Sequence, residues 1–188
     1  MTDSTLIYTI LAILSVSVAI NLKLTFRILQ LMRNPPPQDT ALAFAPGDAV
    51  PEIRGKRLAD AQAMSLDHSG RASVLLFLSS RCPKCREKLP EIAALVPRLG
   101  PAGLDLWLLT TERKGRLEEF LGDGPLMALA LKVSGRAYKQ LNPALASPFY
   151  LFLDHQGQLQ AGGMIGDADW QSFIEQMAEF GDELESVA

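Results

Sequence analysis

Apolar and polar residues along the chain alternate with two different periods, which predict a mixture of strands and helices. The unbroken apolar run 73–78 is typical of a fully buried strand. After a short polar stretch the period becomes that of a helix reaching Leu99, with one apolar face. The apolar positions of that face are Leu89, Ile92, Ala93 and Val96. A buried strand therefore turns into an amphipathic helix close to position 82.

The same alternation continues toward the C-terminus. Apolar runs at 104–110 and 126–133 predict two further strands. Pro148 opens another apolar run, and a turn at 155–157 leads to a returning strand, as in a β-hairpin. A last helix follows Asp167, its expected N-cap. The remaining expected elements are two short edge strands within 50–66, helix 111–121 capped by Thr111 with Glu112 on its solvated face, helix 135–141 capped by Ser134, and strand 158–163.

The order of these elements indicates the fold class. Strands that alternate with helices pair in parallel through right-handed crossovers, and the hairpin adds antiparallel strands at one side. The sequence therefore predicts an α/β fold, with a mixed central sheet and helices on both faces. Its 188 residues provide one domain of ordinary size and an appendage.

An uncharged apolar stretch, 5–22, occupies the N-terminal segment. A helix needs roughly 20 apolar residues to cross a hydrocarbon core, and Lys23 and Arg27 follow the stretch at headgroup positions. A cleaved signal peptide is disfavoured because only Asp3 precedes the apolar run. We expect a transmembrane anchor at 1–34, a linker at 35–45, a folded domain at 46–182 and an acidic tail at 183–188.

Composition narrows the possible functions. The formal net charge is −3, so the chain has no basic surplus of the kind that binds nucleic acid. It has two cysteines, too few for a disulfide scaffold, and its core must therefore carry the fold. The most informative chemistry lies in where these two cysteines are placed.

Both cysteines lie in one C-x-x-C motif, where the buried strand becomes the helix. A helix N-terminus favours an anion, and Arg81 and Lys84 add positive charge that favours a thiolate at Cys82. Pro83 suits the first helical turn, where a missing N–H is tolerated. Cys82 is thus the expected nucleophile, and Cys85, one turn later, would resolve the mixed disulfide. This pattern is the sequence sign of a redox-active dithiol.

Two inert interpretations of the cysteine pair are less favoured. A zinc site needs two more ligands, and the chain offers only His68 and His155, without metal-ligand spacing. We therefore expect no metal. A purely structural disulfide would close a very small loop and would restrain the unfolded chain little.

With the C-x-x-C motif and Pro148, the chain resembles thioredoxin-fold proteins from Pro46 to about Phe180, and in particular the membrane-anchored TlpA/ResA-like thiol–disulfide oxidoreductases. The resemblance implies that the Ser147–Pro148 bond is cis and lies against the motif, with Ser147 offering its backbone to the substrate. It also implies no cofactor other than a redox-active Cys82–Cys85 disulfide.

A narrower resemblance is to the MauD-type accessory proteins of methylamine dehydrogenase. It rests on the stretches 76–85, 154–157 and 163–167 and on the N-terminal apolar segment. It implies formation or rearrangement of disulfides in a client protein, such as the small subunit of a periplasmic amine dehydrogenase, with a separate redox partner.

Three other functions stay open. The same fold serves apocytochrome c thiol reductases of the ResA-like branch, and it also serves as a non-catalytic adaptor with a permanently closed disulfide. A peroxidase is less favoured, because peroxiredoxins place a threonine where this chain has Ser79.

Two positions depart from thioredoxin itself. Arg81 replaces the tryptophan before the first cysteine, and Leu76 replaces the buried acid that helps to deprotonate the second. We therefore expect slow attack by Cys85 and a couple more oxidising than that of thioredoxin, about −270 mV.

The orientation in the membrane rests on two opposing arguments. Lys23, Arg27 and Arg33 follow the apolar stretch, and the positive-inside rule would then place the folded domain in the cytoplasm. Disulfide exchange is more useful on the oxidising side, and large domains often translocate regardless of charge. We expect a single-pass protein of the bacterial inner membrane with a periplasmic domain.

Overall fold

The computed structural model describes residues 8, 11, 13–18, 20–25, 42–66 and 70–187. The chain divides into two compact units, 1–39 and 40–188. In the first unit every described residue is helical, and its large apolar side chains are exposed. None of the helices in the described portion is long and apolar enough to cross a membrane. Much of the expected anchor and linker lies outside the described residues.

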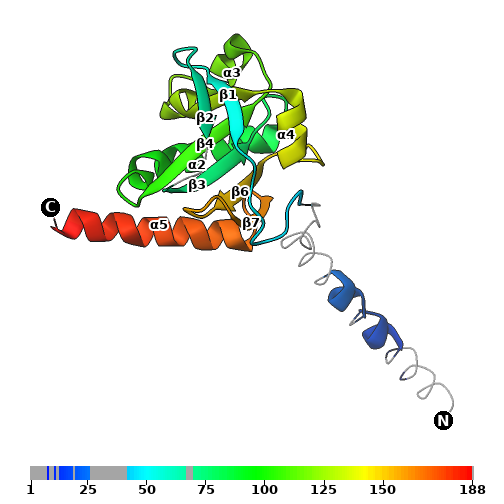
Figure 1. Cartoon of the computed structure of the whole chain (residues 1–188). Helices are drawn as coiled ribbons and strands as arrows, with labels where there is room; N and C mark the ends of the chain where they lie inside the picture. Colours follow the sequence, from blue (N-terminus) through cyan, green and yellow to red (C-terminus); the bar gives the residue numbers. More distant parts are fainter. Residues whose placement is uncertain are drawn as a thin grey trace. The chain divides into compact units, whose positions relative to one another are not determined.

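The second unit is built on a mixed sheet of seven strands among the described residues, in the order β2-β1-β5-β4-β3-β6-β7 (Figure 1). Strands β3, β4 and β5 are parallel, and every other pairing is antiparallel. The strands are β1 (Ile53–Arg57), β2 (Ala63–Leu66), β3 (Ala72–Phe77), β4 (Leu104–Thr110), β5 (Ala130–Val133), β6 (Phe149–Leu153) and β7 (Leu159–Met164). The helices are α2 (Pro83–Leu99), α3 (Lys114–Leu121), the 3-10 helix η1 (Pro125–Leu129), α4 (Gly135–Leu141) and α5 (Ala168–Val187).

Strand β3 shows how the sheet divides the core. Its side chains alternate between the two faces, as a period of two requires. Val74 and Leu76 pack in one buried cluster with residues of α2, α3 and α5. Leu75 and Phe77 pack in the other, with residues of α4 and the segment that precedes β1. The continuous apolar run 73–78 arises because both faces are covered, so the expected α/β architecture with a mixed sheet is confirmed.

Three local expectations are wrong. Helix α3 begins at Lys114 with Arg113 as its N-cap, so Thr111 is not the cap. The run 126–133 is not one strand, because its first half belongs to the 3-10 helix η1. Strand β1 is not an edge strand, since it pairs with both β2 and β5. In each case the tertiary contact, rather than the local propensity, decides the outcome.

Other boundaries agree closely with the sequence. Ser134 caps α4 by accepting from the Ala137 N–H at 3.1 Å, as expected. Asp167 accepts from the Trp170 N–H at 2.9 Å at the start of α5. Helix α5 continues to Val187, into the segment expected as an acidic tail.

Candidate active site

The turn that follows β3 places both cysteines at the carboxyl end of the parallel strands. The Cys82 N–H donates to the Ser79 carbonyl at 3.0 Å and closes this turn. Cys82 has extended backbone and is the N-cap of α2, and Pro83 occupies the first turn as expected. The strand end, the turn and the helix start therefore hold the two cysteine side chains in a defined arrangement.

The two cysteines, both present as thiols, differ in exposure. Cys82 is half-buried, whereas Cys85 is fully buried in the α2 side of the core. The Cys85 N–H donates to Cys82 Sγ at 3.4 Å, and the Ser79 N–H donates to Cys85 Sγ at 3.5 Å. An incoming sulfur can therefore reach Cys82 from solvent, while Cys85 can be reached only from within the site.

Burial sets the protonation of the inner cysteine. It raises the pKa of the Cys85 thiol to about 12, and the neighbouring Cys82 contributes to the rise. Cys85 therefore stays a thiol at neutral pH, and a buried thiol is a poor nucleophile until it loses its proton. The structure thus gives the two sulfurs of one short motif unequal roles.

A cis peptide bond joins Ser147 and Pro148, as the resemblance implies. The Cys82 thiol donates to the Ser147 carbonyl at 3.5 Å, so this loop lies directly against the exposed sulfur. Asn142 positions the loop: its side chain donates to the Ala146 carbonyl at 2.8 Å and accepts from the Ala146 N–H at 2.9 Å. Asn142 is fully buried, and the sequence analysis misses it because a lone asparagine carries no pattern.

Glu112 is a second residue that the sequence analysis misplaces. Instead of lying on a solvated helix face, it precedes α3, and its carboxylate accepts from the Ser80 N–H at 3.0 Å. Its other oxygen, Oε2, is buried and has no hydrogen-bond partner in the described part of the chain. The carboxyl ends of parallel strands share one edge of a sheet, so its position directly after β4 was the available signal. A carboxylate thus lies beside the cysteine turn, although Leu76 itself is buried among apolar side chains.

Tyr138 of α4 forms a further part of the site's surroundings. Its ring packs edge-on against Phe77, with 5.2 Å between the ring centroids. Burial raises the pKa of Tyr138 to about 12, with smaller contributions from Cys85 and Glu112. Tyr138 is therefore neutral at physiological pH and adds an uncharged side chain to the surroundings of the site.

The remaining predicted residues are also placed. Arg81 and Lys84 are exposed beside Cys82, and no ion pair engages them among the described residues. His155 is exposed in the β6–β7 turn, and His68 lies outside the described residues. Across residues 42–66 and 70–187 no group of three or more His, Cys, Asp and Glu could hold a metal ion.

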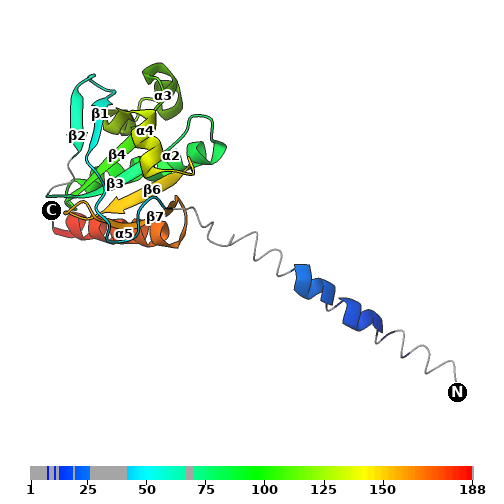
Figure 2. The same cartoon turned by 45° about the vertical axis from the view of Figure 1, so that its right-hand side comes forward.

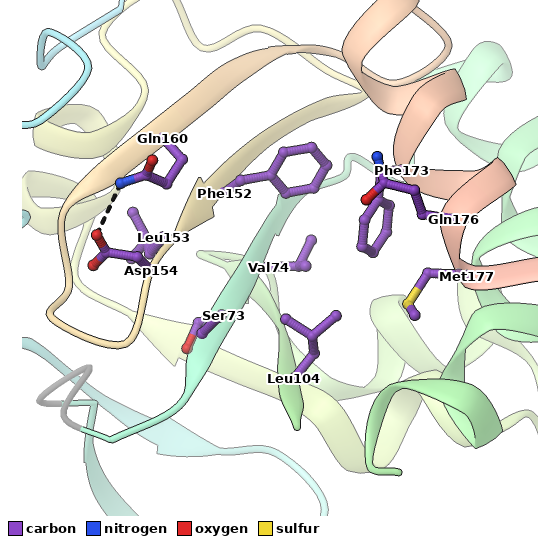
Figure 3. A pocket seen from close by; sticks show the side chains of 11 residues that line it. Ser73, Val74, Leu104, Phe152, Leu153, Asp154, Gln160, Phe173, Gln176 and Met177 are labelled. Atoms are coloured by element: carbon purple, nitrogen blue, oxygen red, sulfur yellow. Dashed lines mark hydrogen bonds between the residues drawn. The ribbon is translucent and has the colours of Figure 1, made fainter. Parts of the chain in front are cut away.

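A cavity of about 350 Å³ lies between the sheet and α5, at the end of the parallel strands opposite to the cysteines (Figure 3). Apolar side chains including Val74, Phe152 and Phe173 line it. Figure 3 also shows the hydrogen bond between Gln160 Nε2 and Asp154 Oδ2, which measures 2.8 Å, at one side. The cavity is lined by the beginnings of β3 and β4, whereas the cysteines follow the end of β3. It is therefore separate from the dithiol.

Comparison with known proteins found similar solved structures but no matching curated sequence. No family model and no curated protein sequence matches the chain. The thioredoxin domain of a thiol-disulfide oxidoreductase from Bacteroides vulgatus has a TM-score of 0.56 and 20% identity, over 71% of this chain and 99% of that one. A thiol:disulfide interchange protein from a Bacteroides species has a TM-score of 0.60 and 18% identity, over 71% and 91%. A peroxiredoxin-like protein from Aquifex aeolicus has a TM-score of 0.55 and 13% identity, over 73% and 88%.

The chain has a thioredoxin-like fold. At these identities the similarity shows the fold and not the activity, and a peroxiredoxin-like protein is among the similar structures. The choice between activities of this thioredoxin-like chain therefore rests on its own site: two thiols three positions apart, one half-buried and one buried. The narrower likeness to MauD-type proteins and the membrane anchor stay predictions.

Proposed function

We propose that the chain is a thiol–disulfide oxidoreductase that forms or rearranges disulfides in a client protein. The observation that carries this proposal is the pairing of a half-buried Cys82 at the start of α2 with a fully buried Cys85. The Cys85 backbone N–H donates to Cys82 Sγ at 3.4 Å, which holds the Cys82 sulfur beside the backbone of Cys85. An exposed sulfur that receives the client and a protected one that resolves it are what two-step exchange requires.

The proposed oxidation begins from the Cys82–Cys85 disulfide. A client thiolate attacks Cys82 Sγ, a client–Cys82 disulfide forms, and Cys85 leaves as a thiolate that takes up a proton. A second client thiolate then attacks the client's own sulfur and releases Cys82 as a thiolate. The client gains a disulfide and the chain gains two electrons, which a separate oxidised redox partner must accept.

The Ser147–Pro148 loop gives the client its place in this scheme. The Ser147 carbonyl accepts from the Cys82 thiol in the reduced chain. A mixed disulfide has no S–H, so the same carbonyl becomes free to accept from a client backbone N–H. Arg81, Pro83 and Lys84 flank the reacting cysteine, and all three are exposed.

A trapping experiment tests the proposed exchange. In the native host, the Cys85→Ser variant cannot form the Cys82–Cys85 disulfide, but its Cys82 thiolate can attack a client disulfide. Without the Cys85 sulfur to resolve it, that mixed disulfide should persist. We expect a high-mass band on a non-reducing gel that disappears with reductant and in the Cys82→Ala/Cys85→Ser double variant. Absence of the band while client candidates, such as an amine dehydrogenase small subunit, are expressed would favour the non-catalytic adaptor.

We also propose that the N-terminal segment anchors the chain in the bacterial inner membrane. Nine large apolar side chains on its described helical residues are between 54% and 72% exposed. Burying such side chains in lipid is favourable, since apolar surface in water costs about 25 cal/mol per Å². Eight of the nine precede Lys23 and all precede Arg27, and basic residues at headgroup positions are typical of the end of an inserted segment.

Thiol labelling in intact cells tests the side of the membrane. We expect Cys82 to react with a membrane-impermeant maleimide without lysis, because the folded domain would be periplasmic. Labelling that requires lysis would place the domain in the cytoplasm, in agreement with the positive-inside rule. The Cys82→Ala variant gives the background of the assay.

A further inference from the structure

Positive charge is concentrated in three short segments of the chain. Residues 79–88, 111–116 and 134–139 together contain nine of the eighteen lysines and arginines, but only two glutamates. The whole chain has a formal net charge of −3, so the rest of the molecule is strongly acidic. A chain that is acidic overall thus contains three locally basic segments.

The fold brings these three segments to one edge of the sheet. Each follows a strand of the parallel set β3, β4 and β5, and parallel strands end at the same edge. The Ser80 N–H donates to Glu112 at 3.0 Å, so Arg81 and Arg113 extend from neighbouring backbone positions. Figure 2 shows α2, α3 and α4 together with the strands that precede them.

Seven cations of the three segments are exposed and free of ion pairs within the described residues, and five of them lie before a helix or within its first three residues: Arg81, Lys84, Arg113, Arg116 and Arg136. We call them the cationic edge. Acids within the three segments are few: Glu87 forms no ion pair in the described part of the chain, and Glu112 uses one carboxylate oxygen to accept from the Ser80 N–H. By contrast, Lys88 at the next turn of α2 is paired with Glu91 at 2.7 Å.

The placement of these charges opposes local stability. The first turns of α2 and α3 contain no acidic residue, although a helix N-terminus favours negative charge and disfavours positive charge. Repulsion among neighbouring unpaired cations adds to this cost. A negatively charged partner would relieve both effects, and the sulfur that reacts with the client lies among these cations.

We propose that the cationic edge binds an acidic polypeptide segment beside the client's reactive cysteine. This inference rests on the proposed function, and it adds a selection rule to it. Opposite charge accelerates encounter and orients the partner more than it adds to final affinity. Clients with acidic residues near the cysteine should therefore exchange faster than neutral or basic ones.

An anionic membrane surface is the alternative occupant of the cationic edge. The geometry favours a polypeptide, because Cys82 Sγ lies within the same surface and must stay open to a client sulfur. Lipid headgroups that covered the edge would block the sulfur on which the chemistry depends. The experiment below therefore includes the lipid composition as a variable.

The test measures the first exchange step with defined peptides. Full-length Cys85→Ser chain in non-ionic detergent reacts with a nine-residue peptide whose central cysteine is disulfide-bonded to 5-thio-2-nitrobenzoate. The Cys82 thiolate attacks the peptide sulfur, the Cys82–peptide disulfide forms, and the coloured thiolate leaves. Three peptides differ only in their flanking residues: glutamate, glutamine or lysine.

We expect the glutamate peptide to react about three- to ten-fold faster than the glutamine peptide at low salt, and the lysine peptide to react slowest. The ratio should approach one at about 0.5 M salt, where screening is strong. The ratio is the decisive quantity, because a change in Cys82 reactivity alone would alter all three rates equally.

Variants locate the effect. The Arg113→Gln/Arg116→Gln double variant keeps both cysteines, Ser80 and Glu112, and it should bring the ratio of the glutamate-peptide rate to the glutamine-peptide rate toward one. The matched control is Arg71→Gln/Arg98→Gln, which removes the same number of charges from the residue before β3 and from the far end of α2, both at the opposite end of the parallel strands. Residue 98 is about 24 Å from residue 82 along the helix, so the control should keep the ratio.

Each outcome decides the proposal. Equal rates for the three peptides, or a ratio unchanged in the Arg113→Gln/Arg116→Gln variant, would overturn acidic recognition and leave the proposed exchange intact. Reaction with none of the peptides would overturn both. Strong slowing of all peptides in anionic but not in neutral nanodiscs would identify lipid as the occupant and also overturn the proposal.

Discussion

At the scale of single residues, the two cysteines differ because of their surroundings rather than their sequence. Cys82 caps α2 and borders solvent, whereas Cys85 is enclosed by the apolar cluster on the α2 side of the sheet. Cys82 can therefore contact the client, whereas Cys85 becomes a nucleophile only after its thiol loses a proton. This division can be measured.

The first prediction concerns alkylation of Cys85. A thiol with a pKa of about 12 is ionised in about one molecule in ten thousand at pH 8. In the Cys82→Ala variant the burial that is the main cause of the raised pKa remains, so we expect iodoacetamide to modify Cys85 far more slowly than an ordinary thiol, whose pKa is about 8.5. Mass spectrometry follows the reaction, and the Cys85→Ala variant reports Cys82 as the comparison. A fast, complete reaction of Cys85 at pH 8 would contradict the burial described above.

The second prediction concerns Glu112, which holds the cysteine turn through the Ser80 N–H. Glu112→Ala leaves that N–H without its acceptor, and loss of a hydrogen bond to a charged group costs about 1.5–3 kcal/mol. Glu112→Gln retains an oxygen acceptor and should cost about half as much. Urea denaturation of the reduced chain gives both values. Equal stabilities of the two variants would show that the Ser80 contact does not stabilise the turn.

Glu112 also bears on the expected slow attack by Cys85. That expectation rested on the missing acid at Leu76, yet a carboxylate is supplied from the loop after β4. The expectation of a couple more oxidising than thioredoxin remains a prediction. A measured potential as low as about −270 mV would contradict it.

At the scale of elements, β7 and α5 meet at a point where only glycine fits. A β-carbon on Gly163 would overlap the Asp167 carboxylate and lie 3.4 Å from the Tyr150 hydroxyl. That carboxylate accepts from the Tyr150 hydroxyl at 2.9 Å and from the Trp170 N–H at 2.9 Å, which begins α5. One glycine therefore permits the contact that joins the hairpin to the last helix.

The third prediction follows from this contact. Gly163→Ala should lower the free energy of unfolding by about 1–3 kcal/mol, because the methyl group displaces Asp167 from both of its donors. Gly115→Ala is the matched control: it lies in α3, and a β-carbon there meets no atom within 4 Å. The control should raise stability by about 0.5–1 kcal/mol, since alanine favours helix more than glycine. Denaturant unfolding measures both, and a neutral Gly163→Ala would refute the overlap.

At the scale of the whole molecule, several buried acids share one direction of pKa change. The pKa of Cys85 rises from 9.0 to about 12, that of Tyr138 rises from 10.0 to about 12, and that of Tyr150 also rises, each mainly through burial. Each group holds its proton in the folded chain at a pH where the unfolded chain has lost it. Folding is therefore linked to proton binding above pH 9.

The fourth prediction is the sign of the pH dependence. The contribution of these groups is fully present below pH 9 and is lost as pH rises through 12, so stability should fall across this window. The slope approaches 1.4 kcal/mol per pH unit for each group that ionises only on unfolding. Denaturation of the reduced chain between pH 8 and 11 measures it. Cys85→Ala should flatten the curve near pH 9–10, and an unchanged slope there would exclude Cys85 as its source.

Local signals along the chain were enough to predict the order of most elements and the position of the reactive pair. Period-two and period-3.6 patterns, the N-caps Ser134 and Asp167, and the C-x-x-C motif after a buried strand are local signals, readable without the fold. Pro148 was also recognisable, because it opens an apolar strand. These features depend on neighbours along the chain, which the sequence contains directly.

The folded chain established which residues far apart in the sequence come into contact. It inserted β1 between β2 and β5, brought Glu112 to the cysteine turn and Asn142 to the loop before Ser147, and enclosed Cys85 while leaving Cys82 open. Burial, and with it the unequal protonation of two thiols three positions apart, depends on packing from every side. A local sequence pattern does not contain information about that packing. The different protonation of Cys82 and Cys85 could therefore be inferred only from the folded chain.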